Sequence, residues 1–176
     1  TASADGHCPP AHAGIPGIWN RQACGDQGGG IMKFDNYMIL DFPSKSSNEA
    51  FARSAVACFA AQMDPTLEEL GDIRTAVSEA VTNCIVHAYQ EKIGKIYITG
   101  EIIEPHTIRI KVRDKGKGIE NIKQAMEPLY SSLGGERAGL GFAVMTSFMD
   151  SVKVRSAVGK GTIVTMTKKI CRRFSI

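Results

Sequence analysis

The sequence predicts an α/β two-layer sandwich, with helices packed on one face of a mainly antiparallel sheet. Alternating apolar and polar residues, typical of half-buried strands, occur near 37–42 and over 95–103, 107–113, 151–157 and 162–170. Apolar residues at three- to four-residue intervals, typical of amphipathic helices, occur over about 47–63, 65–89 and 140–150. The order is one strand, two helices, two strands, a loop-rich middle, one helix and two strands, which favours this architecture.

The first two elements are a strand near 37–42 and a helix. Pro43 ends the strand and predicts that it lies at a sheet edge, because proline cannot donate a ladder hydrogen bond. Ser46 or Ser47 is expected to cap the helix. The apolar side of that helix should consist of Phe51, Val56, Phe59 and Met63.

A second helix is expected to begin at Asp64-Pro65, with the aspartate as cap and the proline at the first helical position. It should continue to Ala88 or Tyr89. Its apolar residues at helical spacing are Leu67, Leu70, Ile73, Val77, Val81, Cys84, Ile85 and Ala88.

The remaining elements follow from the same signals. Two alternating segments flank "EPH" and predict a hairpin, and a short helix is expected from about Glu120 to Met126, ended by Pro128. The stretch "YSSLGGERAG" should be irregular, and "LGFAVMTSFMD" should form a further helix. The segments "SVKVRSA" and "TIVTMTKKI" predict a closing hairpin.

Composition bounds the class of protein. The chain of 176 residues suits one domain, and no apolar run approaches the roughly 18 residues of a membrane span. Residues 1–31 hold 7 of the 18 glycines without periodicity, so we expect a disordered extension or added leader there, and a folded domain over 32–176. The formal net charge of +3 is too small to favour nucleic acid. A cytoplasmic protein that does not bind membranes is expected.

The five cysteines show no CxxC pairing, which favours neither a disulfide framework nor a zinc site. Cys58 and Cys84 lie in apolar helical patterns and are expected to be small buried hydrophobic residues.

Three polar residues interrupt the second helix. Glu79, Asn83 and His87 stand four residues apart, so each is rotated by only about 40° from the last and the three form one stripe. An amide oxygen suits magnesium, and a carboxylate can accept a proton from an attacking hydroxyl. The alternative is an ordinary solvated helix face.

The stretch "RDKGKGI" places Asp114 at a strand end, followed by Gly116 and Gly118. Glycines allow the backbone to approach a ligand closely, and the carboxylate can accept a hydrogen bond from an exocyclic amine. A plain glycine-rich turn is the alternative.

The stretch "ERAGLGF" places Arg137, Gly139 and Gly141 before a helix, where backbone N–H groups and an arginine can bind phosphates. The preceding "YSSLGG" suits a lid. The pattern is not a dinucleotide fingerprint, since no strand leads into GxGxxG, and "VGKGT" is not a P-loop.

These three motifs and "GKGT" resemble, in order, the N, G1, G2 and G3 boxes of the GHKL ATPase superfamily, which has the Bergerat-type ATP-binding fold. From about 37 to 170, the segments "NEAFAR", "DPTLEEL", "VSEAVTNCIVHAY", "VRDKGKGI", "ERAGLGF" and "GKGT" are similar to those of the anti-sigma F factor family. The resemblance implies a serine-protein kinase that inactivates a sporulation sigma factor and uses ATP to phosphorylate a serine of an anti-anti-sigma factor.

The resemblance also implies roles for single residues. Glu79 would be the general base, Asn83 the Mg²⁺ ligand, and His87 a residue near the nucleotide. Asp114 would accept the adenine amine, supported through water by Thr162. The lid and phosphate contacts would come from Ser131, Arg137, Gly139, Leu140 and Gly141, and the adenine pocket would be shaped by Gly116 and Gly118.

The resemblance places the surface shared by the sigma factor and the anti-anti-sigma factor at Glu49 and Arg53. Their spacing alone predicts an i,i+4 surface ion pair. The resemblance further implies a homodimer, which the strand near 37–42 could form.

Three alternatives differ in activity. A histidine-kinase catalytic domain would need a phospho-accepting histidine on a dimerisation helix, and none of His7, His12, His87 and His106 fits. An ATP-gated sigma-binding module without kinase activity would need no base, so Glu79 argues against it. A general-stress anti-sigma kinase would share the same boxes.

Overall fold

The computed structural model describes residues 34–90, 92–103, 106–127 and 140–171. The boundary predicted between residues 31 and 32 lies outside these ranges. The described strands form one antiparallel sheet in the order β1-β2-β3-β5-β4. Their bounds are β1 Phe34–Pro43, β2 Lys95–Ile103, β3 Thr107–Arg113, β4 Ser151–Ala157 and β5 Gly161–Lys169. The predicted edge strand is therefore found, with β2 as its neighbour.

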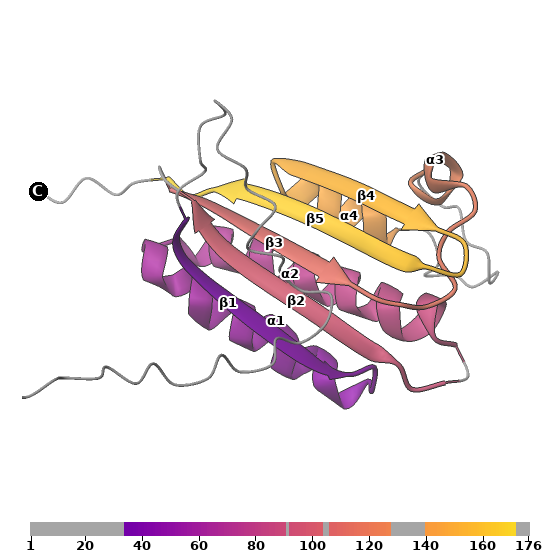
Figure 1. The fold of residues 1–176 in the computed structure, drawn as a ribbon. Helices are drawn as coiled ribbons and strands as arrows, with labels where there is room; N and C mark the ends of the chain where they lie inside the picture. Colours follow the sequence, from indigo (N-terminus) through magenta and orange to yellow (C-terminus); the bar gives the residue numbers. More distant parts are fainter. Residues whose placement is uncertain (1–33, 91, 104–105, 128–139, 172–176) are drawn as a thin grey trace, which may run out of the picture. The chain divides into compact units, whose positions relative to one another are not determined.

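The long helices lie on one face of this sheet (Figure 1). The helices are α1 Ser47–Ala60, α2 Leu67–Asn83, the short α3 Ile122–Ala125 and α4 Gly141–Phe148. This confirms the predicted two-layer sandwich. None of the helices in the described ranges is long and apolar enough to cross a membrane.

The core lies between the sheet and the helices α1, α2 and α4. Ile96 and Ile98 of β2, and Ile108 and Ile110 of β3, are fully buried, because alternate residues of a strand point to the same face. The predicted apolar line of α2 meets them through Ile73, Val77 and Val81, which are also fully buried.

The start of α2 differs from the prediction. Thr66 is the cap: its hydroxyl accepts the N–H of Glu69 at 3.0 Å, and the Glu69 carboxylate accepts the N–H of Thr66 at 2.8 Å. Asp64 instead has φ of 57° and closes a 3₁₀ turn, so the expectation of an aspartate cap with Pro65 as first helical residue was wrong. The reciprocal capping box satisfies two N–H groups, which an Asp64 cap would leave without these partners.

Some expected contacts of the helices are absent. Leu67 is 88% exposed because it precedes the part of α2 that packs on the sheet, and Phe51 is 53% exposed although its ring packs edge-on against Phe42. Cys58 is exposed, so its predicted burial was wrong. Ser46 precedes α1 with helical dihedral angles and makes no side-chain cap.

The end of the second helix is not α-helical. Residues Cys84–Ala88 form a π-helical turn that follows Asn83. A π turn is wider than an α turn, so the rotation from Asn83 to His87 differs from the rotation from Glu79 to Asn83.

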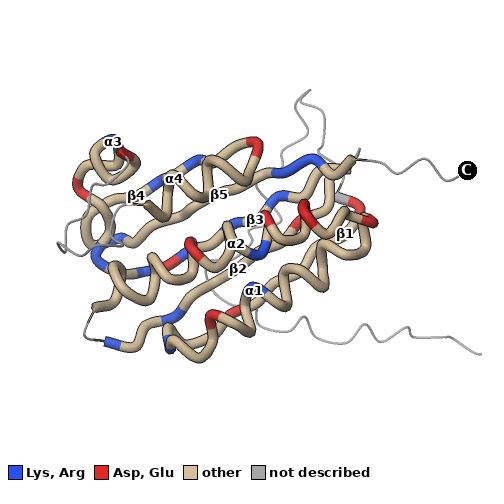
Figure 2. The backbone as a smooth tube through the Cα atoms, turned by 180° about the vertical axis from the view of Figure 1, so that it is seen from behind, with Lys and Arg blue, Asp and Glu red and all other residues tan. Residues whose placement is uncertain are grey.

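Charges of both signs occur along α1 and α2. Figure 2 shows acidic and basic residues interspersed on these helices. This helix-covered face therefore differs from the basic stripe that is typical of nucleic-acid-binding proteins.

Candidate functional site

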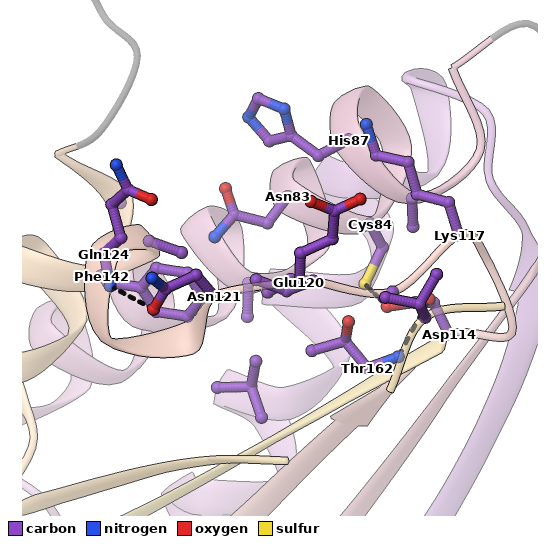
Figure 3. A pocket seen from close by; sticks show the side chains of 18 residues that line it. Asn83, Cys84, His87, Asp114, Lys117, Glu120, Asn121, Gln124, Phe142 and Thr162 are labelled. Atoms are coloured by element: carbon purple, nitrogen blue, oxygen red, sulfur yellow. Dashed lines mark hydrogen bonds between the residues drawn. The ribbon is translucent and has the colours of Figure 1, made fainter. Parts of the chain in front are cut away.

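A cavity of about 430 Å³ lies where the π turn, the end of β3, the start of α4 and the β4–β5 hairpin meet. Its volume falls in the range of small-molecule sites. Asn83, His87, Asp114 and Thr162 all contribute side chains to it (Figure 3). The fold therefore brings together residues from separate predicted motifs, which lie up to 79 positions apart in the chain.

Asp114 is the most buried acid of this cavity, 3% exposed, and follows the last residue of β3. Its Oδ1 accepts the N–H of Gly116 at 2.8 Å and the N–H of Thr162 at 3.2 Å. Burial raises the pKa of Asp114, against the lowering effect of these two hydrogen bonds. The carboxylate is thus held by backbone donors on one oxygen.

The other oxygen of Asp114 is contacted by a thiol. Sγ of Cys84 lies 3.7 Å from Oδ2, and burial together with this neighbouring carboxylate raises the pKa of Cys84 well above its ordinary value. Cys84 is buried as predicted, and it also lines the cavity. The thiol therefore stays protonated and can donate to Oδ2.

Thr162 of β5 bonds Asp114 through its backbone and contacts Ser156 of the neighbouring strand β4 through its hydroxyl. Its N–H donates to Asp114, its carbonyl accepts the N–H of Asp114, and its hydroxyl lies 2.9 Å from the hydroxyl of Ser156. Ser156 in turn accepts the N–H of Ile119 at 2.8 Å. Strand β5 and the loop after β3 are thereby tied together at the cavity floor.

Two glycines are required in the loop after β3. A methyl group on Gly116 would lie 2.3 Å from the carbonyl oxygen of Ala88 in the π turn. Gly118 has φ of +76°, and a methyl group there would lie 2.1 Å from the carbonyl oxygen of Ala157. Any side chain would therefore push the loop away from the π turn or from the β4–β5 hairpin, which enclose the cavity.

The start of α4 lies against the polar stripe of α2. A methyl group on Gly141 would lie 3.1 Å from Oε2 of Glu79 and 3.3 Å from the side-chain oxygen and nitrogen of Asn83. Gly141 and Asn83 line the cavity, whereas Glu79 is not among its described lining residues. Glu79 is thus next to the cavity, behind Asn83 and Gly141.

His87 lies at the same cavity with Lys117 (Figure 3). Burial of the imidazole, reinforced by the charge of Lys117, lowers the pKa of His87. The imidazole is therefore neutral at pH 7, and its buried Nδ1 atom has no hydrogen-bond partner among the described residues.

The oxygen atoms of Asn83 and Glu79 suit Mg²⁺. Within the described residues, no three or more His, Cys, Asp or Glu side chains are grouped to hold a metal ion. Mg²⁺ in nucleotide enzymes is usually held by one or two protein oxygens, water and the substrate phosphates rather than by a protein cage. The donor set near Gly141 fits that mode of binding.

Other predicted residues lie apart from the cavity or outside the described ranges. Ser131, Arg137 and Gly139 fall in residues 128–139, which the structure does not describe. Leu140 is 42% exposed and immediately precedes α4. Glu49 and Arg53 lie on α1 and form the predicted ion pair, with 2.9 Å between Nη1 and Oε2.

The prediction missed several polar residues of the cavity wall. The residues that line it without an assigned role are Cys84, Lys117, Glu120, Asn121 and Gln124. Asn121 also caps α3 by accepting the N–H of Gln124 at 3.1 Å. For Glu120, Asn121 and Gln124, the position shortly after "DKGKGI" was an available signal, because a loop that contacts a ligand commonly continues along it.

Comparison with known proteins gives the family. A family model described as "Histidine kinase-like ATPase domain" matches residues 42–168. An anti-sigma F factor of Caldanaerobacter subterraneus subsp. tengcongensis is 58% identical over 142 residues, which are 80% of this chain and 99% of that protein. An anti-sigma F factor of Clostridium acetobutylicum is 55% identical over 136 residues, covering 77% and 94% of the two chains.

A solved structure supports the fold alone. The RsbU and RsbW domains of a Mycobacterium tuberculosis protein superpose with a TM-score of 0.59 at 16% identity, over 78% of this chain and 33% of that one.

The matched family is one of ATPases, which implies that the domain binds ATP. Its fold, its cavity and the identity over most of its length together show that the chain belongs to the anti-sigma F factor family of histidine kinase-like ATPases.

Proposed function

We propose that this chain is an ATP-dependent protein serine kinase that also binds and inhibits a sporulation sigma factor. The acceptor would be a serine of an anti-anti-sigma factor. The observation that carries this proposal is the meeting of Asp114, Asn83 and Gly141 around one cavity, with Glu79 beside it. The names of the relatives, anti-sigma F factors, support the sigma-factor partner.

The adenine would occupy the deep end of the cavity. Oδ2 of Asp114 would accept the exocyclic amine, while Thr162 would support the base through a water molecule. Gly116 and Gly118 would shape the adenine pocket, because they let the loop after β3 pack closely against Ala88 and Ala157. His87, which lines the same cavity, would lie near the nucleotide.

The phosphates would extend toward α4. Asn83 would hold Mg²⁺, which neutralises phosphate charge during transfer. Backbone N–H groups at the start of α4 would bind phosphate oxygens. Further contacts are assigned to Ser131, Arg137 and Gly139 of the lid and to Leu140.

Glu79 would act as the general base. It would take the proton of the acceptor serine as the serine oxygen bonds to the γ-phosphorus and the bond to ADP breaks. Its place beside Asn83 and Gly141 supports this role, because the acceptor and the γ-phosphate must meet within hydrogen-bond reach of the base.

Protein partners would contact α1 at Glu49 and Arg53. Both the sigma factor and the anti-anti-sigma factor would use this surface, so that binding of one excludes the other. We further propose a cytoplasmic homodimer in which β1, an edge strand, takes part.

Transfer of radiolabelled phosphate tests the kinase proposal. The purified chain, Mg²⁺ and ATP should label an anti-anti-sigma protein encoded in the same genome, and alanine at its acceptor serine should abolish labelling. Glu79→Gln keeps the size of the side chain and should slow transfer by about 10²- to 10⁴-fold. ATP binding without transfer would overturn the kinase proposal, and full transfer by Glu79→Gln would remove Glu79 from its role.

Two related functions make different predictions in the same system. An ATP-gated sigma-binding module would bind the sigma factor but transfer no phosphate, and the carboxylate at Glu79 disfavours it. A general-stress anti-sigma kinase would transfer phosphate but bind a different sigma factor. Titration of candidate sigma factors in the presence of ADP or ATP separates these cases.

A further inference from the structure

Ser78 connects the proposed partner surface to the helix that carries the proposed base. Its hydroxyl donates a hydrogen bond of 2.6 Å to Oε1 of Glu49, across the contact between α1 and α2. The next residue of α2, Glu79, has its carboxylate near Gly141 at the start of α4. Neighbouring positions of α2 thus contact its two neighbouring helices.

Glu49 is the inner member of its ion pair. Nη1 of Arg53 lies 3.0 Å from Oε1 and 2.9 Å from Oε2 of Glu49. The Glu49 side chain is 19% exposed, whereas that of Arg53 is 36% exposed. A partner that approaches α1 would therefore meet the guanidinium more readily than the carboxylate.

The hydroxyl of Ser78 orients this pair. An i,i+4 ion pair at a surface is weak by itself, since both long side chains lose conformational freedom when it forms. A short hydrogen bond to a carboxylate is charge-assisted and roughly twice as strong as one between neutral groups. Because Ser78 lies on another helix, it fixes Glu49 relative to α2 and thereby fixes the place where Arg53 is held.

Arg53 retains donors for a partner. Its hydrogen bonds within the described residues use Nη1. A guanidinium carries five N–H donors in a planar fork that matches the two oxygens of a carboxylate. The outer edge of Arg53 therefore suits an Asp or Glu side chain of a bound protein.

We infer that Ser78 is a positioning residue of the partner surface, holding Glu49 so that the outer edge of Arg53 receives a carboxylate of the sigma factor. The inference rests on the proposed function, which places partner contacts at Glu49 and Arg53. Ser78 is not among the residues that line the cavity, and on this inference it acts on the partner through Glu49.

Affinity for the sigma factor tests this role. Calorimetric titration of the full chain with the sigma factor of the same genome should show binding about fivefold or more weaker for Ser78→Ala, because the hydrogen bond is to a charged group. Ser78→Thr keeps the hydroxyl and should bind within about twofold of the unchanged chain. Ser147→Ala is the matched control, since that exposed hydroxyl bonds the carbonyl of Ala143 in its own helix, α4.

A double-substitution cycle separates positioning from a general structural effect. If Ser78 acts through Glu49 on Arg53, Ser78→Ala should cause no further loss of affinity when Arg53→Ala is already present. Additive losses, or an equal loss of ATP affinity in Ser78→Ala, would overturn the inference. If Ser78→Ala binds the sigma factor with wild-type affinity while Arg53→Ala binds it more weakly, the inference is overturned and the proposed function stays intact. If Arg53→Ala binds with wild-type affinity, the proposed partner surface itself is overturned.

Discussion

The two oxygens of the Asp114 carboxylate have different surroundings. Oδ1 accepts backbone N–H groups of Gly116 and Thr162, which holds the loop after β3 against β5. Oδ2 is contacted by the thiol of Cys84 (Figure 3). Oδ1 of Asp114 therefore has a structural role, whereas Oδ2 is the atom that we propose binds the adenine amine.

Asp114→Asn keeps an oxygen at Oδ1 and replaces Oδ2 by a nitrogen that donates. We expect the melting temperature to change little and the affinity for ATP to fall about 10- to 100-fold, because a donor would then face the adenine amine. Thermal melting and calorimetric titration measure the two quantities. Unchanged ATP affinity would contradict the proposed contact with the amine.

The protonation state of Asp114 should also control binding of the adenine ring. Burial raises the pKa of Asp114, so the carboxylate is lost at a higher pH than an ordinary aspartate would require. A protonated oxygen accepts the amine poorly, and affinity should therefore decrease as the pH falls through this raised pKa. Adenosine is the suitable ligand, because it has no phosphate that titrates; a flat affinity down to the usual range of aspartate would refute this prediction.

Among the elements, α2 links the core to the cavity, which Ala80 and Asn83 help to line. It begins at the capping box of Thr66, packs its apolar face on the sheet, and ends in the π turn Cys84–Ala88. The carbonyl of Ala88 in that turn accepts the N–H of Lys117 at 3.1 Å. The π turn and the loop after β3 therefore form one wall of the cavity together.

Gly116→Ala should damage this wall. Its methyl group would lie 2.3 Å from the carbonyl oxygen of Ala88, and that oxygen belongs to backbone, which cannot simply rotate away. We expect a loss of about 1–3 kcal/mol in the free energy of unfolding, together with weaker ATP binding. Denaturant unfolding and ATP titration measure the two effects.

Gly71→Ala is the matched control within α2. No atom lies within 4 Å of the added methyl group, and alanine is the better helix former. This variant should gain about 0.5–1 kcal/mol in unfolding free energy. A similar loss in both variants would show that the close approach at Gly116 is not the cause.

At the scale of the whole described domain, the sheet has two edges, β1 and β4. Strand β1 carries two exposed apolar side chains, Tyr37 at 60% and Ile39 at 41% exposure. An unpaired strand edge with apolar side chains favours association with another chain. This supports the proposed homodimer through β1.

Ile39→Lys should weaken such a dimer, because each copy would bring a charge to the shared strand region. Light scattering over a range of protein concentrations should show a shift toward monomer. Leu67→Lys, at an 88% exposed position outside the sheet, serves as the control and should leave the mass unchanged. Equal masses for Ile39→Lys and the unchanged chain would exclude β1 from the interface.

Much of this architecture could be predicted because strand and helix periods are local. The alternation over 95–103 and 107–113 matches β2 and β3 at both bounds. The start of α2 was misplaced because two cap signals stand together, and Thr66 with Glu69 forms the stronger reciprocal arrangement. The exposure of Phe51 and Cys58 depends on where α1 meets its neighbours, which helical spacing does not specify.

The residue types and their order along the chain were sufficient to indicate the layers, the required glycines and the polar stripe of Glu79 and Asn83. Tertiary structure decided which side chains of different elements meet. The thiol of Cys84 contacts Asp114 across 30 positions, and the hydroxyl of Ser78 contacts Glu49 across 29. Such contacts depend on the packing and rotamers of two elements at once, and no pattern within either element specifies them.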